Sequence, residues 1–175
     1  MIRIILLFVL GFGVCSMSAQ TPDWMFALEG AYIGYKYVPD IDAGGGQRQE
    51  DARLDGKRNG AEDGFVLQWL TSAEEGTEMV IEHLETWHWN SDLERMVMTR
   101  IVDNRPVVEN WVVTQSSTSN AVLERGGEWK GKPMLMRMIV ERLPGQIRFE
   151  FRTNDGSGKW EMAFRYILDD LILQD

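Results

Sequence analysis

The sequence predicts an all-β protein: an antiparallel up-and-down β-barrel of about nine strands with a short N-terminal helix. Two observations lead to this fold class. Apolar and polar side chains alternate along most of the chain after residue 63, which is typical of half-buried strands. Gly, Pro, Asn, Asp and Ser separate the alternating segments. Consecutive strands joined by such short turns favour a meander that closes into a barrel and so removes exposed edges.

The first 19 residues have the order of a secretory signal peptide. Arg3 is followed by an uncharged apolar run over residues 4–14 and then by the small residues Ser16, Ser18 and Ala19. The run is shorter than the roughly 20 apolar residues that a spanning helix needs, so we expect no transmembrane segment in the mature chain. We therefore expect export to the periplasm or the exterior, and a single domain over residues 20–175. A lipid anchor on Cys15 remains an alternative.

Cysteine content and charge exclude several classes of site. Cys15 is the only cysteine and lies in the signal segment, so the mature chain can form neither a disulfide nor a thiolate metal site. The whole chain has 18 basic and 27 acidic side chains, and removal of the signal takes away Arg3 and no acid. Such an acidic chain lacks the basic face that phosphate binding needs, so we expect no nucleic-acid partner.

The elements after the signal follow in order. Residues 22–28 suit a short helix with Asp23 in its first turn. Segment 39–63 contains three consecutive glycines and many charges but almost no large apolar residue, which predicts a long loop. Before the C-terminal hairpin, the predicted strands are 31–38, 64–72, 78–89, 93–102, 106–114, 120–125 and 132–143.

The C-terminal hairpin shows the clearest alternation. Apolar residues alternate with charged ones in its first strand, at Ile147, Phe149 and Phe151. The second strand repeats the pattern, with one face formed by Trp160, Met162, Phe164 and Tyr166. Turn residues 154–158 lie between them. Segment 93–102 also fits helical spacing, but a helix there would interrupt the meander, so the pattern favours a strand.

Two segments resemble a known family of barrels. The stretch from Leu28 to Gly34 resembles the opening of lipocalin-like barrels, where a Gly-x-Trp motif begins the first strand after a short helix. The stretch 149–156, followed by Trp160 and Tyr166, resembles the C-terminal hairpin of secreted bacterial proteins of this calycin type. The resemblance implies a closed barrel whose interior can hold a small molecule.

His83 and Glu85 are the candidate polar contacts of a ligand site. On a regular strand, His83 shares one face with Met79, Ile81, Glu85, Trp87 and Trp89. If this face lines a cavity, the two polar residues orient a ligand, and Trp87, Trp89 and Trp111 form part of the wall. The alternative is a histidine packed in the barrel wall. His88 faces the other way, so the two histidines cannot bind one metal ion, and we expect no metal or other cofactor.

Arg100, Glu109 and Arg137 interrupt otherwise apolar faces. One interpretation is an Arg–Glu pocket for a carboxylate or another polar head group, with Arg100 and Arg137 as ligand contacts. The alternative is a partly solvated outer wall on which ion pairs contribute little. Methionines at 96, 98, 134, 136 and 138 suit either an adaptable cavity wall or ordinary core packing.

Three functions follow from these residues. The sequence favours a binding protein, without catalytic residues, that holds a small hydrophobic or amphipathic molecule. A calycin-type enzyme would use His83 and Glu85 as an acid–base pair. An interaction module would have a barrel filled by its own side chains and would bind a partner through its loops.

Overall fold

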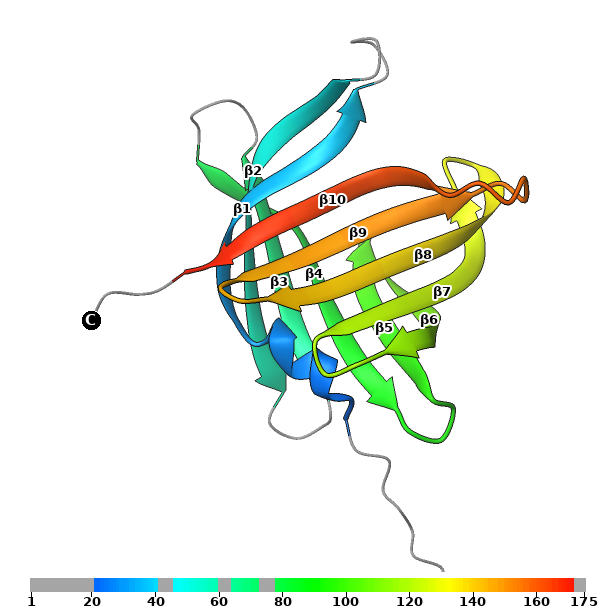
Figure 1. Cartoon of the computed structure of the whole chain (residues 1–175), viewed down its shortest axis with the longest axis horizontal. Helices are drawn as coiled ribbons and strands as arrows, with labels where there is room; N and C mark the ends of the chain where they lie inside the picture. The colour runs from blue at the N-terminus through cyan, green and yellow to red at the C-terminus, as the bar shows by residue number, and fades with distance from the viewer. Residues whose placement is uncertain (1–20, 41–45, 60–63, 73–77, 172–175) are drawn as a thin grey trace, which may run out of the picture.

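Ten antiparallel strands form one closed barrel, with a short 3₁₀ helix at one end (Figure 1). The computed structural model describes residues 21–40, 46–59, 64–72 and 78–171. The helix is η1 (Asp23–Leu28). The strands are β1 (Gly30–Asp40), β2 (Gly46–Asn59), β3 (Gly64–Ser72), β4 (Met79–Asn90), β5 (Arg95–Val102), β6 (Arg105–Ser116), β7 (Asn120–Trp129), β8 (Lys132–Leu143), β9 (Gln146–Asn154) and β10 (Glu161–Asp170). The predicted antiparallel up-and-down barrel is confirmed.

The sheet closes because β1 has two partners. β1 pairs with β2, where Tyr35 lies opposite Asp51, and with β10, where the same Tyr35 lies opposite Ile167. Every other strand pairs with its neighbours in the sequence. Closure therefore pairs both edges of the meander, the arrangement that leaves no open edge strand.

The predicted loop over 39–63 is wrong, because most of it is strand β2. Ala52, Leu54 and Gly56 alternate toward the barrel interior and are buried. The outward positions between them carry Arg53 and Asp55, which form an ion pair with an N–O distance of 3.0 Å. Small inward residues and charged outward residues make a strand whose hydrophobic signal is weak, and this strand brings the total from nine to ten.

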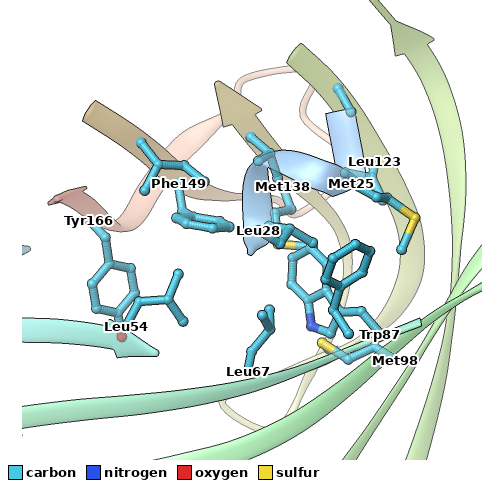
Figure 2. Close-up of a cluster of buried hydrophobic side chains, with 14 of the residues drawn as sticks. Met25, Leu28, Leu54, Leu67, Trp87, Met98, Leu123, Met138, Phe149 and Tyr166 are labelled. Carbon is cyan, nitrogen blue, oxygen red and sulfur yellow. The ribbon is translucent and has the colours of Figure 1, made fainter. Parts of the chain in front are cut away.

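The helix η1 closes one end of the barrel, as Figure 1 shows below the strands. Its Trp24, Met25 and Leu28 are almost completely buried. In Figure 2, Met25 and Leu28 point toward buried side chains of the barrel, including Leu67 and Trp87. The η1 end of the barrel is thus filled with side chains, and any internal space must lie toward the other end.

Two bulges correct the predicted strand faces. In β4, His83 lies opposite Trp69 while Ile81 lies opposite Leu70, so Glu82 is an extra residue and Ile81 does not share the face of His83. In β10, the register shifts between Met162 and Phe164, so these two residues do not share the single face predicted for them. A bulge inserts one residue into one strand only and changes which side chains point inward beyond it.

The predicted signal segment lies outside the described residues. Within residues 21–40, 46–59, 64–72 and 78–171, no helix has the length and apolar character needed to cross a membrane.

Candidate functional site

A cavity of about 460 Å³ lies in the barrel, and all ten strands contribute to its lining. It lies toward the end opposite η1, because its lining includes residues near the β1–β2, β7–β8 and β9–β10 connections. The floor is apolar and consists of the buried side chains of Trp87, Met98, Met136, Met138 and Phe149. The predicted methionine-lined interior is therefore present in part. Met96 lies in the buried core, and neither it nor Met134 belongs to the lining.

Glu85 organises one side of the cavity. The residue is only 5% exposed, and its Oε2 accepts hydrogen bonds from the indole N–H groups of Trp69 at 3.2 Å and Trp87 at 2.9 Å. Its Oε1 lies 3.4 Å from His83 Nε2, and the His83 ring stacks on the Trp69 ring with centroids 5.8 Å apart. Inward alternation along β4 places His83, Glu85 and Trp87 together, as the sequence predicts.

The bulge in β4 adds a second polar cluster beside the first. Glu82 lines the cavity together with His83, although the two residues are adjacent in the chain. Its Oε2 accepts a hydrogen bond from the hydroxyl of Tyr166 at 3.0 Å, and its Oε1 forms an ion pair with Lys36 Nζ. Burial raises the pKa of the Tyr166 phenol, and the negative charge of Glu82 raises it further. A regular alternation would place Glu82 outside, so the sequence alone did not identify it.

The third cluster contains two arginines and one glutamate. Glu109 Oε1 accepts hydrogen bonds from Arg100 at 3.0 Å and from Arg125 at 2.7 Å. The Arg125 guanidinium carbon lies 4.9 Å from the centroid of the Trp111 ring. Burial lowers the pKa of Arg125; the charge of Glu109 opposes this shift and the charge of Arg100 adds to it.

Gly127 makes room for Arg125. A Cβ atom at position 127 would lie 2.5 Å from Arg125 Nη1 and 2.4 Å from Met136 Cε, which is closer than real contacts allow. The missing side chain therefore lets a guanidinium lie over the backbone of β7 inside the barrel. The sequence could have revealed Arg125, because it lies two residues after the buried Leu123 on the same strand and so points to the same face.

Three of the seven predicted site residues do not line the cavity. Arg137 lies on the outer face of β8, where it pairs with Glu124 at 2.5 Å and covers the Trp160 ring at 4.0 Å. Trp111 is buried in the core and Trp89 packs partly buried against it, but neither belongs to the lining. His83, Glu85, Trp87 and Arg100 do line the cavity.

No known protein-family model matches the chain, and no curated protein matches it.

The cavity combines an apolar floor with three hydrogen-bonded polar clusters. Across the described parts of the chain, no group of three or more His, Cys, Asp or Glu residues lies close enough together to hold a metal ion.

Proposed function

We propose that the protein is an exported, lipocalin-like binding protein that holds a small amphipathic molecule inside its barrel. The observation that carries this proposal is the cavity of about 460 Å³, which is within the roughly 300–1,000 Å³ of small-molecule sites. Its apolar floor suits the body of the ligand, and a few polar groups in fixed positions suit one polar end.

The distribution of side chains along the barrel favours this function over that of a filled interaction module. The core cluster fills the end near η1, where Leu28 and Leu54 are fully buried. Toward the other end, the interior contains the cavity instead of further packed side chains. A barrel that served only as a scaffold would gain stability from filling this space, because dispersion contacts are lost around a void.

The contacts of Glu85 favour binding over acid–base catalysis. Its carboxylate already accepts hydrogen bonds from Trp69 and Trp87, which fix the orientation of both indole rings. The carboxylate therefore has a clear role in shaping the cavity wall. Export is supported by the apolar run at residues 4–14, which has the pattern of a signal peptide.

The proposal is tested by titration with N-phenyl-1-naphthylamine, a neutral hydrophobic probe whose emission rises in apolar surroundings. We expect saturable binding with a dissociation constant in the micromolar range, measured by probe emission and by calorimetry. Met138 lies on the cavity floor, and Met138→Trp places a larger side chain in the cavity. We expect this substitution to weaken probe binding about tenfold or more, a change of roughly 1.4 kcal/mol.

The matched control is Ile139→Trp, because Ile139 is the next residue on β8 and points to the other face. It should bind the probe as the wild type does, and circular dichroism checks that both variants are folded. Absence of saturable binding to the wild type, or equal weakening in both folded variants, would overturn the proposal.

A further inference from the structure

We propose that the ligand is a planar aromatic anion, whose ring lies against an aromatic wall in the cavity and whose negative group binds Arg100 and Arg125. The aromatic wall is the set of ring side chains Trp69, Trp129, Phe151, Phe164 and Tyr166, all of which line the cavity. This inference rests on the proposed binding function and names the chemical class of the ligand.

The arginine cluster has one more positive charge than negative charge. Arg100 and Arg125 share the single carboxylate of Glu109, and each uses one terminal nitrogen for it. A guanidinium has five N–H donors, so both arginines keep donors for a further acceptor. Arg100 Nε and Arg125 Nε have no hydrogen-bond partner among the described residues. The side chain of Arg125 is 16% exposed and that of Arg100 is 38% exposed, so the excess charge is partly buried, and an anionic ligand would pair it.

Four of the five other carboxylates of the lining have donors among the described residues, and Glu128 has none. Glu82 is paired with Lys36, and Glu85 accepts two indole N–H groups. Glu50, nearer the rim, is paired with Arg48 at 2.6 Å. The arginine cluster is thus a place in the cavity wall with more positive than negative charge, although Glu109 Oε2 also lacks a hydrogen-bond partner among the described residues. Such an excess of positive charge suits carboxylate or sulfonate recognition.

The aromatic wall has the geometry that favours a flat ring. The rings of Phe151 and Phe164 are stacked with centroids 5.0 Å apart and an interplanar angle of 6°, and Trp129 lies 5.2 Å from Phe151. Trp69 continues the wall, with its centroid 4.6 Å from that of Tyr166. Rings that already pack against one another lose little side-chain freedom when a planar ligand packs on them.

Most of the aromatic wall lies on other strands than the arginine cluster, although Trp129 belongs to β7, the strand of Arg125. Arg100, Glu109 and Arg125 come from the adjacent strands β5, β6 and β7. Phe151, Phe164 and Tyr166 come from β9 and β10, which β8 separates from β7 in the closed strand order. A ligand between them can contact rings with its body and guanidinium groups with its charged end at the same time.

The test compares three matched ligands by calorimetry. 2-Naphthoate carries the ring and the charge, 2-naphthalenemethanol carries the ring without the charge, and undecanoate carries the charge on a flexible chain with the same number of carbon atoms. We expect 2-naphthoate to bind about tenfold tighter than either of the other two. Equal affinity for 2-naphthoate and 2-naphthalenemethanol would overturn the role of the arginines, and equal affinity for undecanoate would overturn the role of the rings.

Substitutions test separately the contact of the ligand with the arginines and its contact with the aromatic wall. Arg100→Met and Arg125→Met should each remove most of the preference for 2-naphthoate while binding of 2-naphthalenemethanol is retained, which also shows that the cavity is intact. The matched control is Arg137→Met on the outer face of β8, which should leave both affinities unchanged. Phe164→Leu should weaken both naphthalene ligands and leave undecanoate unchanged.

The outcomes separate this inference from the proposed function. If N-phenyl-1-naphthylamine binds but 2-naphthoate shows no preference, the anion inference fails and the binding function stands. Tighter binding of 2-naphthylmethylammonium than of 2-naphthoate would likewise overturn it. If the neutral probe itself does not bind, both proposals fail. The comparison of ligands on the wild-type protein decides the inference even if an arginine variant does not fold.

Discussion

Two carboxylates of the cavity lining each contact side chains from two other strands. Glu82 on β4 contacts Lys36 on β1 and Tyr166 on β10, and Glu109 on β6 contacts arginines on β5 and β7. Each carboxylate therefore fixes side chains from three strands at one point. Charge-assisted hydrogen bonds of this kind are stronger than neutral ones, so the polar wall of the cavity is held in position before any ligand binds.

The Tyr166 phenol predicts a specific response to alkaline pH. Burial and the charge of Glu82 raise its pKa in the folded protein, whereas an unfolded tyrosine ionises near pH 10, at about its ordinary value. The neutral phenol therefore stabilises the fold fully below about pH 10, and this contribution is lost as the pH rises further. In Tyr166→Phe, we expect the free energy of unfolding to be lower by about 1 kcal/mol at pH 7, because the hydrogen bond to Glu82 is missing.

Above about pH 10 the difference in unfolding free energy between the wild type and Tyr166→Phe should shrink and then reverse. The reason is that only the wild type loses about 1.4 kcal/mol per pH unit through Tyr166. Urea unfolding of both proteins at a series of pH values from neutral to alkaline measures this difference in the free energy of unfolding. Tyr35→Phe on β1 removes an exposed phenol and serves as the control. A constant difference between wild type and Tyr166→Phe across this range would contradict the assignment.

Among the elements, the alternating strands are predictable and the exceptions have identifiable causes. β9 is clear in the sequence because Phe149 and Phe151 alternate with charged residues. Strand β2 was not predicted because two of its inward residues, Ala52 and Gly56, are small, so inward and outward positions differ little in hydrophobicity. The bulge at Glu82 was hidden because the residues around it alternate as a regular strand would, and only pairing with β3 reveals the extra residue.

The contact between η1 and β2 depends on the absence of a side chain at Gly56. A Cβ atom there would lie 1.7 Å from the carbonyl oxygen of Leu28, so Gly56→Ala must displace the helix or the strand. Overpacking of this kind costs about 1–3 kcal/mol, and a clash with backbone should reach the upper end of that range. We expect urea unfolding to show a loss of about 3 kcal/mol.

Gly126→Ala is the matched control, because an added Cβ on β7 would have no heavy atom within 4 Å. Its free energy of unfolding should remain within about 0.5 kcal/mol of the wild type, which is typical of unconstrained surface positions. Equal losses in the two variants would show that the close approach of Leu28 to Gly56 does not limit packing.

At the scale of the whole molecule, the sequence is a better guide to whether a side chain points inward or outward than to how far along the barrel axis it lies. Trp111 and Trp87 both point inward, but only Trp87 reaches the cavity, because the η1 end is filled by the core. Arg137 was a candidate either for the pocket or for a partly solvated outer wall, because its neighbours Leu135 and Ile139 are apolar; Leu135 is 51% exposed, and the outer wall is what the structure has. Apolar residues on the outside of this barrel remove the contrast on which such assignments depend.

Closure of the barrel predicts cooperative unfolding. The buried core takes side chains from η1 and from all ten strands, so separation of one strand exposes residues that pack against many others. We expect urea to produce one transition, with the same midpoint and slope when followed by far-ultraviolet circular dichroism and by tryptophan emission.

Leu28→Ala provides the companion measurement. The substitution removes a fully buried side chain of η1 and should cost about 2–5 kcal/mol. It should lower both midpoints equally if the helix and the barrel form one cooperative unit. A separate early transition in tryptophan emission would show instead that the helix detaches first.

The filled end of the barrel at η1 also has a kinetic consequence. Trp24, Met25 and Leu28 close that end, so a molecule in the cavity enters and leaves by the same opening. An incoming molecule cannot drive an occupant out through the closed far side. We therefore expect exchange of one ligand for another to be governed by the departure of the first, at a rate independent of the concentration of the second.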